Sequence, residues 1–196
     1  MKVLVACEFS GIVRDAFIAK GHDAWSCDLL PTEKHGPHIQ GDVLEILDGG
    51  WDLMIAHPPC KYLALCQAWR CNRDAERANR REEAVQFATT LWGAPIKLKC
   101  IENPKSQLST MMAPKSHTIH PWQFGYREMK ETWLWLYGLP HLIPTDNVGP
   151  PPKRDDPERK KWEKIWRMSP SPNRSQDRSR TYQGIANAMA DQWSNL

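Results

Sequence analysis

The chain has 196 residues, of which 41% are hydrophobic and 25% charged, and its formal net charge is +3. This size and apolar content predict one globular domain with a sizeable core. Its six cysteines include no CxxC pair and no adjacent histidine pattern, which argues against a zinc site and a disulfide framework, so we expect reduced thiols and no bound metal.

The first thirty residues predict a β-α-β unit. Residues 2–7 form a short apolar run that leads into Glu8-Phe9-Ser10-Gly11, and residues 12–20 carry apolar side chains at helical spacing. The apolar run is too short for a signal peptide or a membrane span, so we expect a cytoplasmic protein. Residues 23–28 then predict a second strand, which ends on the carboxylate of Asp28.

The middle of the chain continues the alternation of strands and helices. After a loop rich in Pro, Gly and His, residues 52–56 form a continuous apolar run that predicts a buried parallel strand. A long helix is predicted over residues 73–92, and another strand over residues 96–101. This alternation predicts an α/β fold with a mostly parallel sheet, whose ligand crevice lies beyond the carboxyl ends of the strands.

The last third of the chain differs in composition. Residues 131–137 alternate aromatic and aliphatic side chains and predict a later strand. Residues 140–180 are rich in proline, so that only residues 156–167 are expected to hold a helix there. We therefore expect a core over residues 1–140, a Pro-rich basic insertion over 141–180, and a helix that returns to the core over 181–196.

The insertion also concentrates positive charge. Residues 150–180 carry ten Lys or Arg side chains against five Asp or Glu. A local basic stretch on an otherwise balanced protein is typical of a surface that binds polyanions, although exposed charges often serve solvation alone. Lys160, Lys161 and Lys164 are the expected phosphate contacts, and Trp162 or Trp166 is either a base-stacking or a packing residue.

Candidate binding residues follow the first strands. Gly11 allows close approach of the backbone, and the Asp28 carboxylate could accept hydrogen bonds from ribose hydroxyls; alternatively Gly11 serves only a tight turn and Asp28 a loop. Asp42 could accept from an adenine amino group or act as an N-cap. Nucleoside binding is the functional hypothesis for these positions.

Cys60 is the candidate nucleophile. Pro58 and Pro59 stiffen the backbone after a buried strand and hold the next side chain at the mouth of the crevice. The adjacent Lys61, or a nearby helix N-terminus, would lower the pKa of the thiol. Glu102 ends a neighbouring strand, and sulfur and carboxyl together indicate covalent catalysis on a polarised ring. Cys7, Cys27 and Cys100 are expected to be buried and inert.

The order of these motifs resembles that of the DNA cytosine-C5 methyltransferases. The matching motifs are Phe9-Ser10-Gly11, Asp28, Gly41-Asp42, Pro58-Pro59-Cys60, Glu102-Asn103-Pro104 and Gly184-Ile-Ala-Asn187-Ala. The resemblance implies a Rossmann-like class I S-adenosylmethionine-dependent methyltransferase, of a small, phage-type form without a full target-recognition domain. It also implies DNA as the partner, duplex or single-stranded.

The resemblance assigns roles to individual residues. Cys60 would add to C6 of cytosine while Glu102 holds N3 and the exocyclic amine, so that C5 takes the methyl group from the cofactor. The family's Arg-x-Arg, which contacts the base and orients the acid, has no clean copy, and Arg127, Lys130 or both are its candidate substitutes. The residues expected to bind S-adenosylmethionine are Glu8, Phe9, Ser10, Gly11, Asp28, Leu29, Asp42, Val43, Pro58 and Asn187.

Other functions stay open at this point. Amino-methyltransferases carry an Asp/Asn-Pro-Pro-aromatic motif, and His57 and Cys60 stand in its two chemical positions, which disfavours amine methylation. The short interval in place of a recognition domain, together with Lys61 where the family has Gln, favours a non-catalytic or regulatory nucleic-acid-binding protein. Methylation of RNA or of a free nucleotide is a third alternative.

Overall fold

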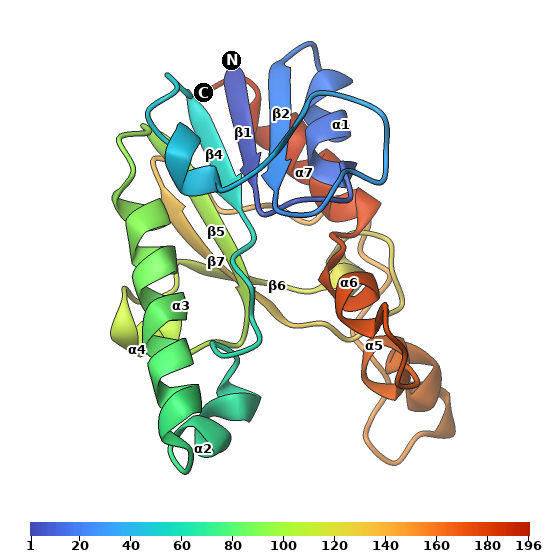
Figure 1. Ribbon diagram of the computed structural model, residues 1–196. Helices are drawn as coiled ribbons and strands as arrows, with labels where there is room; N and C mark the ends of the chain where they lie inside the picture. The colour runs from blue at the N-terminus through green and yellow to red at the C-terminus, as the bar shows by residue number, and fades with distance from the viewer.

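The computed structural model describes all 196 residues as an α/β fold built on one seven-stranded sheet (Figure 1). The strand order is β3-β2-β1-β4-β5-β7-β6. The strands are β1 (Lys2–Ala6), β2 (Asp23–Asp28), β3 (His38–Gln40), β4 (Leu53–Ala56), β5 (Leu98–Pro104), β6 (His117–Ile119) and β7 (Thr132–Tyr137). Strands β1 to β5 pair in parallel, whereas β7 is antiparallel to both β5 and β6. The predicted fold class, α/β with a mostly parallel sheet flanked by helices, is confirmed.

Helices cover both faces of the sheet. The α-helices are α1 (Ile12–Ile18), α2 (Ala68–Cys71), α3 (Ala75–Gly93), α4 (Leu108–Met111), α5 (Lys164–Arg167), α6 (Arg174–Ser179) and α7 (Gln183–Trp193). Four short 3-10 helices accompany them: η1 (Val43–Ile46), η2 (Leu65–Gln67), η3 (Pro121–Gln123) and η4 (Pro157–Trp162). None of these helices combines the length and the apolar character needed to cross a membrane.

Two hydrophobic cores result, one on each face. Val3 and Val5 of β1 pack with α1 and α7, while Leu4 and Ala6 of the same strand pack with α3. Successive side chains of a strand point to opposite faces, so a strand that is buried on both faces must be apolar throughout. This is why β1 and β4 read as continuous apolar runs.

Several elements differ from the sequence-based expectation, among them β6 and α4, which lie where no element was predicted. β3 lies inside the predicted loop, because its three residues obtain their strand geometry from hydrogen bonds to β2 and carry no apolar pattern of their own. The antiparallel direction of β7 was not predicted. The expectation that only residues 156–167 hold a helix in the insertion is wrong, because α6 begins after Pro172 and so no proline interrupts it.

Candidate active site

The candidate residues gather at the carboxyl edge of the parallel strands. The strand order reverses between β1 and β4, and such a switch point is where open α/β sheets bind their ligands. The turn over residues 8–11 leaves β1, and residues 57–60 leave β4, so both border this point. Glu102 lies beside them, in the last three residues of β5. Strand topology thus brings the predicted cofactor turn, nucleophile and acid to one place.

The turn after β1 is held by a buried carboxylate. Glu8 Oε1 accepts from the Val13 N–H (2.7 Å) and the Ser10 hydroxyl (3.2 Å), and Oε2 accepts from the Arg14 N–H (3.2 Å), so Glu8 satisfies the N-terminus of α1. Gly11 has φ +70°, and an added Cβ would lie 2.5 Å from the Arg14 guanidinium. Glycine at position 11 is therefore required by both conformation and space.

The second group of predicted cofactor residues follows β2 and β3. Asp28 Oδ1 accepts from the Leu30 N–H at 2.9 Å, and Asp42 Oδ1 caps η1 by accepting from the Leu44 N–H at 3.0 Å. Neither Oδ2 atom has a hydrogen-bond partner, so each carboxylate keeps an oxygen for a ligand. Their negative charges, together with burial, raise the pKa of Cys27 to about 11.

The remaining residues of this group differ in exposure. Leu29 is 72% exposed, whereas Val43 is buried. Cys7 is largely desolvated, and burial together with Asp28, Cys27 and Asp42 raises the pKa of its thiol well above the usual range. Cys100 is fully buried, and its thiol pKa is also raised, first by burial and then by Glu102. Cys27 and Cys100 are buried as expected, whereas Cys7 is half-buried and lines the pocket at the switch point, contrary to the expectation.

The loop that carries Cys60 is fixed by its neighbour β5. Asn103 Nδ2 donates to the Pro58 carbonyl at 2.8 Å, and the Ser106 hydroxyl donates to the Leu63 carbonyl at 3.2 Å. Cys60 itself is exposed, and its carbonyl accepts from two N–H groups farther along the loop. Cys60 is therefore carried on a loop anchored at both ends.

The electrostatic environment of Cys60 corrects one expectation. Partial desolvation and the negative charge of Glu102 raise the pKa of the Cys60 thiol, and this outweighs the opposing effects of Lys130 and Arg178. Lys61 is not among the charges that act on the thiol, and its ammonium lies over the Tyr62 ring, 5.1 Å from the centroid. The predicted lowering of the thiol pKa by Lys61 is wrong, and the free protein carries Cys60 mainly as a thiol at neutral pH.

Glu102 is held in the opposite state. Its burial would raise the pKa of the carboxyl group, but the hydrogen bond from His57 and the positive charge of Lys130 lower the pKa below its ordinary value. His57 Nδ1 lies 3.1 Å from Glu102 Oε2. Glu102 is thus a carboxylate that accepts hydrogen bonds.

Lys130 and Arg127, the two candidate substitutes for the Arg-x-Arg motif, differ in their position relative to the site. Lys130 acts on both Cys60 and Glu102 through its charge, and its ammonium donates to the Arg180 carbonyl at 3.4 Å. Arg127 is exposed, and its side chain makes no hydrogen bond or ion pair. The structure brings Lys130 to the site and leaves Arg127 outside it.

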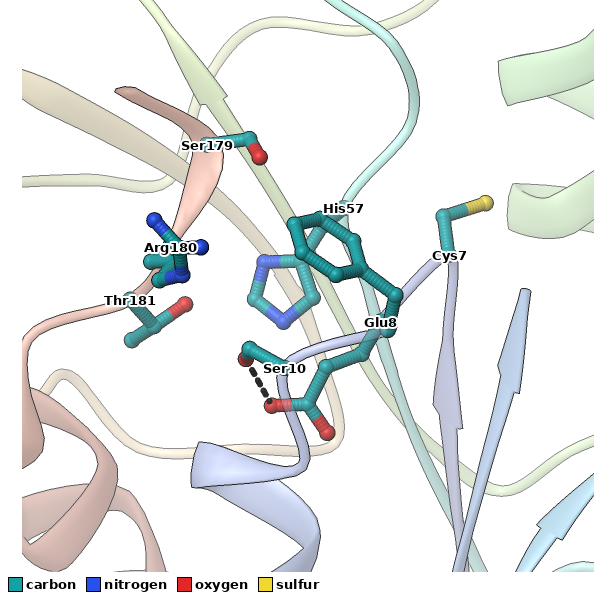
Figure 2. Close-up of a pocket in the computed structure, with 8 residues that line it drawn as sticks. Cys7, Glu8, Ser10, His57, Ser179, Arg180 and Thr181 are labelled. Atoms are coloured by element: carbon teal, nitrogen blue, oxygen red, sulfur yellow. Dashed lines mark hydrogen bonds between the residues drawn. The ribbon is translucent and has the colours of Figure 1, made fainter. Parts of the chain in front are cut away.

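A pocket at the switch point joins the core to the end of the insertion (Figure 2). It is a small hollow, partly open to solvent, and Figure 2 shows His57 between the turn after β1 and the segment after α6. Its lining residues are Cys7, Glu8, Phe9, Ser10, His57, Ser179, Arg180 and Thr181. Sequence analysis did not assign His57 or residues 179–181 to the site, because their part in it depends on long-range folding.

The C-terminal motif contributes differently from the expectation. Asn187 is exposed on α7, its side chain accepts from Gln183 Nε2 at 2.9 Å, and it does not line this pocket. Gly184 lies directly against the Phe124 carbonyl, where an added Cβ would overlap the oxygen. The glycine of this motif thus has a packing role, which lets α7 approach the segment after β6.

The chain is similar in structure to known proteins. No family model matches it, and no curated protein sequence matches it. The crystal structure of S. pombe Dnmt2 methyltransferase is similar to it with a TM-score of 0.47 and 14% sequence identity. The match covers 86% of this chain and 56% of that one, so the chain spans little more than half the length of that protein.

The basic insertion is ordered against the core. The Met129 N–H donates to the Trp162 carbonyl at 2.9 Å, and Arg180 forms ion pairs with Glu33 and Asp177. Trp162 is buried and packs, which decides against base stacking at that position, whereas Trp166 is 54% exposed. Of the three predicted phosphate contacts, Lys161 and Lys164 form ion pairs with Glu158 and Glu128, and Lys160 forms none.

Proposed function

We propose that this protein is an S-adenosylmethionine-dependent methyltransferase that transfers a methyl group to C5 of cytosine in DNA through a covalent Cys60 adduct. One observation carries the proposal. Cys60, after β4, and Glu102, on the adjacent β5, meet at the switch point of the sheet, where Glu102 acts on the thiol through its charge. A thiol beside an oriented carboxylate is the arrangement that nucleophilic addition to a pyrimidine needs.

The residues after the first strands fit the cofactor. The pocket at the switch point offers the Phe9 ring and the hydroxyls of Ser10 and Thr181, and the free oxygens of Asp28 and Asp42 can accept from ribose and adenine. S-adenosylmethionine, when bound, supplies an electrophilic methyl group. The residues named here would hold it.

The chain's own residues perform the remaining steps. The exposed Cys60 thiol gives its proton to solvent, its sulfur bonds to C6, and the electrons of the C5–C6 double bond make C5 nucleophilic. Glu102 binds the exocyclic amine and N3 of the flipped base. After C5 has taken the methyl group, loss of the C5 proton breaks the bond between sulfur and C6 and restores the ring.

The raised pKa of the Cys60 thiol favours a second candidate, a non-catalytic nucleic-acid-binding protein that keeps the methyltransferase shell. One experiment separates the two. The protein is incubated with methyl-labelled S-adenosylmethionine and with duplex DNA, single-stranded DNA, RNA or nucleotides, and the nucleosides are then identified by mass spectrometry. We expect labelled 5-methylcytosine from DNA. Cofactor binding without transfer to any substrate would favour the non-catalytic protein.

A further inference from the structure

His57 bonds to Glu102 through one ring nitrogen and leaves the other without a partner, and the mechanism described above gives it no role. Its side chain is 9% exposed, and Nδ1 faces Glu102 Oε2 at 3.1 Å. Because an ionised carboxylate only accepts hydrogen bonds, Nδ1 carries the hydrogen. Nε2 is buried without a partner, although the ring lines the pocket (Figure 2). A buried polar atom without a partner costs free energy, so it indicates a functional rather than a packing role.

The orienting role toward Glu102 is otherwise unfilled. Arg127 does not reach the site, and Lys130 acts on Glu102 through charge while its ammonium donates to the Arg180 carbonyl. His57 makes the hydrogen bond that contributes most to keeping Glu102 ionised. Because His57 and Cys60 lie on the same loop, the hydrogen bond from His57 links the position of Glu102 to that of Cys60.

We propose that His57 positions Glu102 and supplies the proton that Glu102 gives to N3 of the target base. This rests on the proposed function. As sulfur bonds to C6, the ring electrons move toward N3, and N3 takes a proton from the Glu102 carboxyl group. Glu102 receives that proton from Nδ1 while Nε2, on the ring that lines the pocket, takes a proton from solvent, so the imidazole stays neutral with its hydrogen on Nε2. Elimination of Cys60 returns the proton along the same path.

The test replaces His57 by Gln, whose amide can still donate to Glu102 but carries no exchangeable charge. The charged or titratable groups that act on or lie beside His57 are Glu102, Glu8, Arg180, Lys130, Cys7 and Cys60. We expect the single-turnover rate to fall by about 10²-fold or more, with affinities for S-adenosylmethionine and DNA almost unchanged. The rate of His57→Gln relative to the wild type should rise as pH falls, because solvent must then protonate Glu102, whereas both proteins need the Cys60 thiolate equally.

A second variant and a control complete the experiment. Added imidazole should restore part of the rate of His57→Ala, and His141→Gln, in the loop after β7, should match the wild type. A His57→Gln protein with the wild-type rate and pH profile would overturn the role of His57 alone. A wild type that forms neither 5-methylcytosine nor an adduct with 5-fluorocytosine DNA would overturn the proposed function, and this inference with it.

A different observation points to a second nucleic-acid surface, which we define as residues 61–81 and call the α2–α3 basic surface. It carries six Lys or Arg side chains against two Asp or Glu. Only Arg80 among the six pairs with a carboxylate. Trp69 is 54% exposed, and the guanidinium groups of Arg70 and Arg73 lie 5.2 and 5.5 Å from its ring centroid.

The α2–α3 basic surface lies where it could bind a nucleic acid whose base reaches Cys60. It follows the nucleophile directly in the chain, whereas Arg178, from α6, acts on Cys60 from the insertion. Figure 1 shows α2 and α6 on opposite sides of the molecule. We infer that the α2–α3 basic surface binds single-stranded nucleic acid, with an unpaired base stacked on Trp69 and phosphates on the unpaired arginines. A base within a duplex has no free face for such stacking.

Fluorescence anisotropy with labelled single-stranded and duplex DNA tests this inference without requiring methyl transfer. We expect Trp69→Ala to weaken single-strand binding by roughly tenfold and to leave duplex binding nearly unchanged. Ile143→Ala removes an even more exposed apolar side chain, after β7, and serves as the control. Unchanged single-strand binding, or an equal loss for both DNA forms, would reject the stacking surface, and labelled methyl transfer would still report on the proposed function.

Discussion

At the residue scale, the proposed chemistry depends on one thiol, that of Cys60, whose surroundings oppose its ionisation. Desolvation and Glu102 raise the pKa of Cys60, and the two nearby cations only partly offset them. Thiolate must therefore form during the reaction, and the arrival of a positively charged cofactor or the loss of water would change the balance. The position of Cys60 specifies its role more strongly than its resting charge does.

The first prediction concerns covalent addition. Cys60→Ser should abolish methyl transfer while it spares binding of S-adenosylmethionine and DNA, because only the addition to C6 needs the sulfur. DNA with 5-fluorocytosine cannot lose its C5 substituent as a proton, so the wild-type protein should stay attached to it through denaturing electrophoresis. An active protein without this adduct, or an active Cys60→Ser variant, would exclude the mechanism.

The second prediction concerns the pH dependence of Cys60. Because the thiol pKa is raised, the thiolate fraction and the rate of alkylation by iodoacetamide should increase as pH rises above neutrality. Lys130→Met removes a charge that lowers this pKa, so the pH midpoint of alkylation should move upward. Lys61→Met should leave it in place. Peptide mass spectrometry at position 60 measures both, and a midpoint that Lys61→Met moves and Lys130→Met does not would contradict this account.

Sequence patterns placed Cys60 and Glu102 correctly at strand ends, because a strand's apolar run and its end are local features. The sign of the Cys60 pKa shift was beyond such patterns, since Glu102, Lys130 and Arg178 reach it only through the fold. The same limit applies to His57, whose bond to Glu102 spans 45 residues of chain.

At the element scale, the parallel part of the sheet was predictable and its antiparallel edge was not. Strands β1 and β4 are buried between two helical layers and carry continuous apolar runs that show in the sequence, while β2 and β5 have mixed sequences. β3 has no such run, and nothing local distinguishes an antiparallel β7 from a parallel one. α7 can approach the core closely because Gly184 has no side chain.

The third prediction tests that approach. Gly184→Ala places a Cβ against the Phe124 carbonyl, a backbone atom that cannot turn away, so it should destabilise the fold by about 1–3 kcal/mol. Gly93→Ala, at the end of α3, meets no atom within 4 Å and should be neutral or slightly stabilising. Thermal unfolding of the two variants measures the difference, and equal stabilities would refute the packing role of Gly184.

At the scale of the whole molecule, positive charge borders the candidate site from two directions. The α2–α3 basic surface follows the nucleophile, and the insertion, through Arg178 and Arg180, reaches the nucleophile and the pocket. The insertion is too short for a separate recognition domain, so it can supply phosphate contacts more readily than base readout. Much of the insertion's positive charge is already paired with carboxylates of the protein. The contributions of its paired and unpaired cations to binding can therefore be measured separately.

The fourth prediction uses this distinction. Lys153, Arg154 and Lys160 have no carboxylate within ion-pair distance, whereas Lys161, Lys164 and Arg167 each have one. Cations that are free to meet phosphates release counterions on binding, and each contact adds about −0.9 to the slope of log K against log salt for duplex DNA. Replacing the three free cations by Gln should therefore make that slope shallower by roughly 2 to 3 and weaken binding in low salt.

Replacing the three paired cations by Gln removes the same formal charge, yet it should change the slope less, because those side chains must first leave their carboxylates. Titrations at several salt concentrations with both triple variants compare the two sets directly. Equal slopes for the two variants would mean that binding responds to net charge alone, and a salt-insensitive complex would remove the insertion from the nucleic-acid interface.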